Sequence, residues 1–278
     1  MNCINCVFHV AGLFAAFAYE DISYQKVATQ SHTSTSVNSD ARNAVDGNIK
    51  TCMKTEDIGL TSKHRTVWWK VDLGEVNNIY SIHIQFKNYD GDLVRQRGRF
   101  AGFSLYVSDT DVSSISEIKS STLCYKDGPQ LPPLNFTTIC TEKGRYVIYY
   151  NERLDRVIYP AIYQKQNVYS ELCKVIVQGC KNASVYGSNC DTPCPTNCKD
   201  STCHIQSGTC FTCKPGWTGT YCNTQCGKGW FGLNCSQHCV GHCKYNMSCN
   251  HATGQCDEGC AAGWTGTTCD KGRFCHFT

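Results

Sequence analysis

The sequence lacks the motifs that mark most enzymes, nucleic-acid-binding proteins and membrane proteins. It has no nucleophile elbow, Walker loop, H-E-x-x-H or kinase motif, and the acid pair Asp90 and Asp92 lies in an Asp-Gly-Asp turn, which is more typical of a loop than of catalysis. The net charge is only +3 and the basic residues are scattered, so no strong field favours nucleic acid. No apolar run after residue 18 reaches the ~18 residues of a membrane span. We therefore expect neither catalysis nor a nucleic-acid partner.

Residues 1–18 have the pattern of a secretory signal peptide. Val7–Ala18 is an apolar run too short to cross a bilayer, and it ends in Ala16-Phe17-Ala18, a small-x-small cleavage site. The segment has no lysine or arginine, so an uncleaved anchor is the alternative. Cleavage would remove Cys3 and Cys6. The signal-peptide pattern predicts a protein that is secreted or lies on the extracellular face of the plasma membrane.

The 23 cysteines divide the chain into two parts. The cysteine-poor part, 19–178, carries most of the apolar residues, whereas the chain from 180 onward is rich in glycine, cysteine, asparagine and threonine. The second part cannot bury enough apolar surface to fold without cross-links. Zinc is an alternative use of these thiols, because several histidines lie nearby, but the even cysteine count within the repeats favours disulfides.

Alternating apolar and polar residues in the first part predict an antiparallel β-sandwich. The pattern is clearest in Val67–Gly74, where Val71 and Leu73 can point to one side of a strand and Lys70 and Asp72 to the other. Six strand segments are expected: Trp69–Leu73, Tyr80–Phe86, Phe100–Val107, Thr137–Ile139, Tyr146–Tyr150 and Leu172–Val177. The expected core residues are Val45, Trp68, Val71, Leu73, Ile82, Ile84, Phe103, Leu105, Val107, Val147, Ile148, Val175 and Val177.

The second part is an internal repeat. Eight cysteines between Cys180 and Cys222 recur between Cys226 and Cys269 at an offset of 45–47 residues, and the turn sequence Gly-Trp-Thr-Gly occurs in both copies. Tyr186-Gly187 likewise recurs as Phe231-Gly232. In units this small, an aromatic ring stacked on a glycine-rich turn replaces a core. We expect units at 180–225 and 226–270, with 271–278 as a tail or the start of a truncated repeat.

Three segments of the first part resemble the F-type, fucose-binding lectin domain, a relative of the discoidin-type galactose-binding-like sandwich. They are Ala28-Thr29-Gln30-Ser31, Asn43-Ala44-Val45-Asp46-Gly47-Asn48 and Trp68-Trp69-Lys70-Val71-Asp72-Leu73-Gly74. The resemblance covers 24–179. It implies an all-β, galactose-binding-like sandwich that binds carbohydrate, with disulfides Cys52–Cys173 and Cys124–Cys140.

The sugar site implied by this resemblance is only partly matched. The family uses one histidine and two arginines, and these positions fall on Lys54, near Lys87 and on Arg99. The intervening loop, Asn88–Gly98, is longer than the family norm. Arginine holds sugar hydroxyls better than flexible lysine does. We therefore expect either a fucose-type glycan or a more anionic one, such as a sialylated or sulfated glycan. The alternative is a relaxed pocket in which Lys54 and Lys87 are solvated surface residues.

The resemblance also implies calcium, the only cofactor we expect. The ligands would be oxygen atoms, which hard cations prefer. They would come from Asn43, Asp46, Asn48, Thr51 and Cys52. A glutamate that the family places after the last-strand cysteine is Lys174 here. Three alternatives therefore remain: a calcium site, a Lys174 ammonium that pairs with Asp46 in place of the ion, or an Asx-rich turn with no ion.

The cysteine spacing and Gly-Trp-Thr-Gly turns of the second part resemble the tandem EGF-like modules of multiple-EGF-like and scavenger-receptor class F proteins. Spacing alone does not determine connectivity. The resemblance implies Cys180–Cys190, Cys194–Cys203, Cys198–Cys210, Cys213–Cys222, Cys226–Cys235, Cys239–Cys249, Cys243–Cys256 and Cys260–Cys269. Cys275 is left over; we interpret it as the first cysteine of a truncated further repeat, with a free or intermolecular thiol as the alternative. N-glycosylation sequons begin at Asn135, Asn182, Asn234 and Asn246.

Two functions fit these features. The first is a secreted or cell-surface recognition protein, as in innate immunity, whose sandwich binds glycans or glycoproteins on cells or microbes while the EGF-like modules act as a spacer or partner surface. Lectin sites are individually weak, so oligomers would add avidity. The second is the truncated ectodomain of a scavenger, engulfment or adhesion receptor, with a membrane span beyond Thr278 and a sandwich that has become a protein-binding module.

Overall fold

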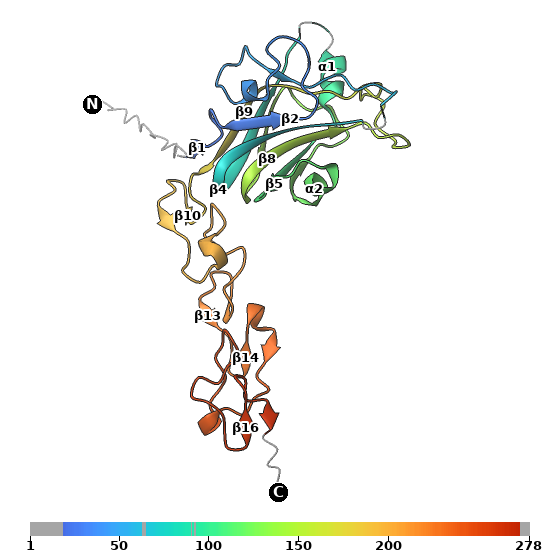
Figure 1. Cartoon of the computed structure of the whole chain (residues 1–278). Coiled ribbons are helices and arrows are strands. Elements are labelled where there is room, and N and C mark those ends of the chain that lie inside the picture. The colour runs from blue at the N-terminus through green and yellow to red at the C-terminus, as the bar shows by residue number, and fades with distance from the viewer. Residues whose placement is uncertain (1–18, 63–64, 90, 92, 273–278) are drawn as a thin grey trace, which may run out of the picture.

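The computed structural model describes residues 19–62, 65–89, 91 and 93–272. The predicted signal peptide, the Asp90 and Asp92 pair and Cys275 lie outside these residues. The chain forms a β-sandwich, here called the head (19–180), and a narrow series of small units, here called the stalk (181–272), which extends from one end of the head (Figure 1). The expectation of a mostly β fold is confirmed, and every pairing of named strands is antiparallel.

The head is organised by one long strand, β4 (Thr66–Phe86), where the sequence predicted two separate strands. A shift of register between Asp72 and Asn77 divides β4 into two halves with different neighbours. The first half lies between β2 (Val27–Gln30) and β8 (Lys143–Glu152). The second half lies between β7 (Asn135–Ile139) and β9 (Glu171–Cys180). A strand that passes through a bulge in this way can contribute to both layers of a sandwich.

The remaining elements of the head extend these layers. β5 (Ser104–Ser108) pairs with β8 and β6 (Thr122–Lys126), while β1 (Glu20–Asp21) and β3 (Met53–Lys54) pair with β9. Three helical segments connect the strands: η1 (Ala41–Ala44), α1 (Leu93–Phe100) and α2 (Ile115–Ser120). The sequence analysis predicted none of these three segments. Phe100 accordingly ends α1 instead of beginning a strand.

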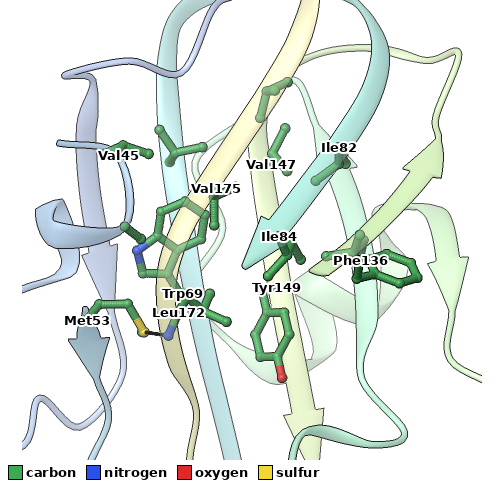
Figure 2. Packing of buried hydrophobic residues seen from close by; sticks show 14 of the residues in the cluster. Val45, Met53, Trp69, Ile82, Ile84, Phe136, Val147, Tyr149, Leu172 and Val175 are labelled. Atoms are coloured by element: carbon green, nitrogen blue, oxygen red, sulfur yellow. Dashed lines mark hydrogen bonds between the residues drawn. The ribbon is translucent and has the colours of Figure 1, made fainter. Parts of the chain in front are cut away.

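The apolar core lies between the two layers, and Trp69 is its largest side chain. Figure 2 shows Trp69 close to Val175 and Leu172. Its side chain is 1% exposed and its indole Nε1 donates a hydrogen bond to the Ala41 carbonyl at 2.9 Å. The prediction of Trp68 as a core residue was wrong. Trp69 shares the side of the strand occupied by Val71, and strand side chains alternate; the other predicted core residues are buried.

The opposite side of β4 is also covered, which the sequence pattern did not reveal. Trp68 is half-buried against a second apolar cluster that includes Ile118 of α2. Lys70 is only 7% exposed, and its ammonium pairs with Asp111 and donates to the Val112 carbonyl at 2.8 Å. A polar residue at an outward position is therefore buried here, because the segment leading into α2 lies over it.

The stalk contains four small two-stranded sheets and three short 3₁₀ turns. The sheets pair β10 (Val185–Tyr186) with β11 (Thr192–Pro193), β12 (Trp217–Thr218) with β13 (Thr224–Gln225), β14 (Trp230–Phe231) with β15 (Gln237–His238), and β16 (Trp264–Thr265) with β17 (Lys271–Gly272). The turns are η2 (Lys199–Ser201), η3 (Leu233–Cys235) and η4 (Lys244–Asn246). Most of its buried apolar residues are cysteines.

Ten disulfides join the cysteines in the pairs that the two resemblances implied. The head contains Cys52–Cys173 and Cys124–Cys140, and Cys180–Cys190 joins the head to the stalk. The stalk contains Cys194–Cys203, Cys198–Cys210, Cys213–Cys222, Cys226–Cys235, Cys239–Cys249, Cys243–Cys256 and Cys260–Cys269. Every cysteine in the described part of the chain is paired, so none there is available as a zinc thiolate. Within the same residues, no helix combines the length and apolarity that a membrane crossing requires.

The head and the stalk are in direct contact. Ile205 and Val185 of the stalk pack with Tyr19, Tyr80 and Cys180 of the head. The buried side chain of Asn78 donates hydrogen bonds to the carbonyls of Val185, at 3.0 Å, and Cys203, at 2.8 Å. This joint combines apolar packing, two hydrogen bonds and a disulfide.

Candidate functional site

The three residues expected to bind a glycan come from separate elements. Lys54 ends β3, Lys87 directly follows β4, and Arg99 lies in the last turn of α1. In Figure 1, α1 lies at the end of the head away from the stalk. The structure brings all three residues near one another around Glu171 and two tyrosines that the sequence analysis did not identify.

Glu171, the first residue of β9, is at the centre of this cluster and is 4% exposed. Its Oε1 atom lies 3.3 Å from the Lys54 ammonium and accepts a hydrogen bond of 2.5 Å from the Tyr89 hydroxyl. The Lys87 amide donates to the Glu171 carbonyl at 3.1 Å. Strand pairing sets this arrangement, because Lys54 and Glu171 are direct partners in the β3–β9 register.

Two tyrosine rings contact the cations. The Arg99 guanidinium lies 5.2 Å from the centre of the Tyr169 ring and 6.0 Å from that of Tyr89. The Lys87 ammonium lies 5.8 Å from the Tyr89 ring and that of Lys54 5.9 Å from the Tyr169 ring. These are distances at which a cation is attracted to an aromatic face. The cluster therefore offers both positive charge and apolar ring surface.

The tyrosine hydroxyls stay protonated at physiological pH. Burial and the hydrogen bond to Glu171 raise the pKa of Tyr89 above its ordinary value. Burial raises the pKa of Tyr169 to about 12, an effect that the nearby Arg99 partly offsets. Both groups can therefore donate a hydrogen bond.

A pocket of about 290 Å³ opens at this cluster. It is lined by Lys54, Lys87, Tyr89 and Glu171 of this cluster, together with Ser36, Val37, Asn38, Ser39, Lys50, Thr51 and Cys52. Its volume is near the lower end of the ~300–1,000 Å³ typical of small-molecule sites. Arg99 does not line the pocket itself, but its guanidinium contacts the ring of Tyr89, which does. Thr51 and Cys52 come from the predicted calcium segment, so the two predicted sites meet in one pocket.

The backbone around Arg99 is held in place by a buried arginine, Arg153, which directly follows β8. Arg153 is fully buried and donates hydrogen bonds to the carbonyls of Gly98, Arg99 and Ala101 at 3.0–3.2 Å. The side chain of Asn151 donates to the Arg99 carbonyl at 3.3 Å. Carbonyls at a helix C-terminus have no partner within the helix, and arginine is a suitable donor for them. Burial lowers the pKa of Arg153, but arginine stays charged in proteins.

Oxygens of the predicted calcium segment already accept hydrogen bonds from other groups of the same segment. The two carboxylate oxygens of Asp46 accept from the Asn48 amide at 2.7 Å and the Thr51 hydroxyl at 2.6 Å. The Asn43 side-chain amide donates to the Cys52 carbonyl at 3.3 Å. The donor types fit calcium, but the segment supplies only one carboxylate. These residues would suit a weak calcium site.

Lys174 does not take the place of the ion. Among the ion pairs of the described residues there is none between Lys174 and Asp46. Lys174 lies opposite Gln85 in the β4–β9 register. Burial and, to a smaller extent, the positive charge of Lys174 lower the pKa of His83. The hypothesis of a Lys174–Asp46 pair was wrong, because successive residues of β9 point to opposite sides and Cys173 faces the calcium segment through its disulfide.

The comparisons with known proteins agree with the observed fold. Residues 43–148, just over a third of the chain, match the family model described as the NedA-like, galactose-binding domain. This range contains the predicted calcium segment and Lys54, Lys87 and Arg99, whereas Glu171 and Tyr169 lie beyond it. No curated protein sequence matches the chain significantly.

Several solved structures are similar to part of this chain. A fucolectin from striped bass (Morone saxatilis) serum is 22% identical over 58% of this chain and 47% of its own, with a TM-score of 0.41. The chain thus spans about half the length of that lectin. A fucose binding module of Streptococcus pneumoniae is 18% identical over 57% of this chain and 96% of its own, with a TM-score of 0.39. A chitosan-binding module from Paenibacillus sp. IK-5, solved with chitotriose, is 17% identical over 57% of this chain and 99% of its own, with a TM-score of 0.40.

Proposed function

We propose that this protein, a galactose-binding-like sandwich followed by EGF-like repeats, is a non-catalytic extracellular protein that recognises carbohydrate. The ligand would bind in the pocket lined by Lys54, Lys87, Tyr89 and Glu171, here called the Glu171 pocket. The observation that carries the proposal is this convergence of cations, an aromatic ring and a carboxylate in a domain whose matched family is named for galactose binding. Planar rings and charged hydrogen-bonding groups are what recognition of a sugar requires.

The charge of the pocket favours an anionic glycan over fucose. Lys54, Lys87 and Arg99 supply three positive charges near one carboxylate, Glu171. Lysine acts as a point charge and not as a planar fork, so it binds a carboxylate or sulfate more readily than it orients a set of neutral hydroxyls. A sialylated, sulfated or uronic-acid-containing glycan would use these charges.

The stalk would act as a spacer in an oxidising environment. Seven disulfides lie within it, and disulfides at this density form in secreted and extracellular proteins. The four sequon residues are all exposed, so each can accept an N-linked glycan. They are Asn135, Asn182, Asn234 and Asn246. Calcium would bind at Asp46 and its neighbours, beside the pocket.

A glycan array with the full chain tests this function. We expect anionic glycans among the hits, and a loss of at least about tenfold in affinity for the variants Lys87→Ala and Arg99→Ala. Lys228→Ala, which removes an exposed cation from the stalk, is the matched control and should bind as the wild type does. An array without hits, or hits that both head variants retain, would contradict the proposal and favour a protein-binding role for the sandwich.

A further inference from the structure

The Glu171 carboxylate is incompletely hydrogen bonded. Its Oε1 atom is close to Tyr89 and Lys54, but Oε2 is buried and has no hydrogen-bond partner in the described part of the chain. A buried polar atom without a partner is costly, and native structures keep few of them. An exception of this kind in the wall of a pocket is a position that a ligand can satisfy.

The chemistry of Oε2 restricts what the ligand can be. A carboxylate oxygen accepts hydrogen bonds and donates none. A sulfate, phosphate or carboxylate group would be repelled by it, whereas a hydroxyl would donate to it. The two side chains that contact Glu171, Tyr89 at 37% exposed and Lys54 at 35%, are on the surface, so a ligand can displace them without disturbing the core.

The cations around Glu171, in contrast, favour a ligand that carries a negative charge. Lys87 and Lys50 line the same pocket, and Arg99 lies against the Tyr89 ring. Of the described residues that line the pocket, Glu171 is the only acid, so this part of the wall attracts negative charge. A ligand that satisfies the whole pocket therefore carries a negative charge and, a short distance from it, a free hydroxyl.

We infer that Glu171 determines the specificity of this pocket, and that its ligand class is a carboxylate-bearing sugar whose hydroxyl donates to Glu171 while its acid group faces Lys87 and Arg99. This inference rests on the proposed carbohydrate function and narrows it. Neutral fucose lacks the charge, and a simple inorganic anion lacks the hydroxyl.

The test uses the full chain and competition by defined sugars. Methyl β-glucuronide and the methyl glycoside of N-acetylneuraminic acid should compete for the best glycan on the array, while methyl α-fucoside and inorganic sulfate should compete at least tenfold less well. Monodeoxy analogues of the better acid then remove one hydroxyl at a time. We expect the removal of one particular hydroxyl to lower the affinity at least tenfold.

The variant Glu171→Gln should lose at least tenfold in affinity for the acidic sugar and no longer distinguish the deoxy analogues. Glu142→Gln removes an acid at a distance from the pocket and should bind within twofold of wild type. If Glu171→Gln does not fold, the deoxy series on the wild-type chain still decides the question. The inference is overturned if no deoxy analogue differs by more than twofold, or if sulfate or fucoside competes equally well. An array without any hit would instead overturn the proposed function.

Discussion

The head and the stalk are stabilised by different means. The head has a large apolar core with Trp69 and Tyr149 at its centre, and only two internal disulfides. The stalk has few buried apolar side chains other than cysteine and contains seven disulfides of its own. The difference shows how chain segments of unlike composition solve the same problem: one gains stability by burying apolar surface, the other by restricting the unfolded chain.

The two repeats of the stalk also share a small substitute for a core. The ring of Tyr186 packs on Gly208 and that of Phe231 on Gly254, and a Cβ at either glycine would lie only 2.4 or 2.5 Å from the ring. This confirms the expectation that an aromatic ring stacks on a glycine turn in each unit. The glycine packed under each ring, which the sequence analysis did not name, follows it by more than 20 residues.

Reduction of the disulfides should produce the largest difference in stability between the head and the stalk. Loops of about ten residues contribute roughly 2–3 kcal/mol each in the chain-entropy model. The buried clusters of the stalk consist mainly of the cysteines themselves, so little other packing compensates for their loss. We expect the reduced and alkylated stalk to lose its amide protection from hydrogen exchange, while the strands of the head keep theirs. A stalk that stays protected after complete alkylation would show that packing is sufficient there.

Replacement of one tryptophan in each region gives a matched comparison. Trp69→Ala should cost about 3–5 kcal/mol, because it removes a fully buried ring and a hydrogen bond. Trp264→Ala should cost less than about 1 kcal/mol, since that ring is only half-buried and stacks on exposed His242. Urea unfolding monitored by circular dichroism measures both. Equal losses would mean that the stalk aromatics are as important as the core of the head.

Calcium should stabilise the head alone and weakly. Sites in extracellular modules have dissociation constants of ~10⁻⁴–10⁻³ M, so several millimolar calcium should add about 1 kcal/mol. We expect the melting temperature of the head to rise with calcium and to fall again with EDTA, and Asp46→Asn to abolish the rise. An unchanged melting temperature would favour an Asx-rich turn with no ion, and a rise that persists in the variant would place the ion elsewhere.

The smallest effect concerns an ion pair on the surface of the head. Arg145 donates two hydrogen bonds of 2.7 Å to Asp72 and holds the pKa of that carboxyl below its ordinary value. The unfolded chain therefore binds this proton more readily than the native one. The stabilisation is complete above the unfolded pKa of about 3.9 and is lost as the pH falls through the lower pKa of the folded state.

Asp72→Asn tests this dependence. The difference in unfolding free energy between wild type and variant should be small at pH 7, because the pair is partly solvated, and should shrink toward zero below about pH 4. Arg145→Gln should behave in the same way. A difference that stays constant down to pH 3 would show that the ion pair does not contribute through proton linkage.

The candidate site was partly accessible from the sequence. The resemblance identified Lys54, Lys87 and Arg99, but not Glu171, Tyr89 or Tyr169, although one signal for Glu171 was available. In an antiparallel pair the residue numbers of partners have a constant sum, so the expected bridge Cys52–Cys173 already placed Lys54 opposite Glu171. No comparable signal existed for Arg153, whose partners include carbonyls of α1, which lies far away along the chain, as well as the nearby carbonyl of Gln164.

The sequence by itself determined the two-part organisation, the β character of the head, the repeat of the stalk and, with the two resemblances, the disulfide pairs. These properties depend on local periodicity and spacing, which are visible along the chain. Only the tertiary structure decided that Trp69 fills the core, that Lys70 is buried beneath the segment before α2, and that Glu171 lies between the cations of the pocket. Each of these depends on which distant segments pack together, and burial and charge pairing are properties of the packed chain.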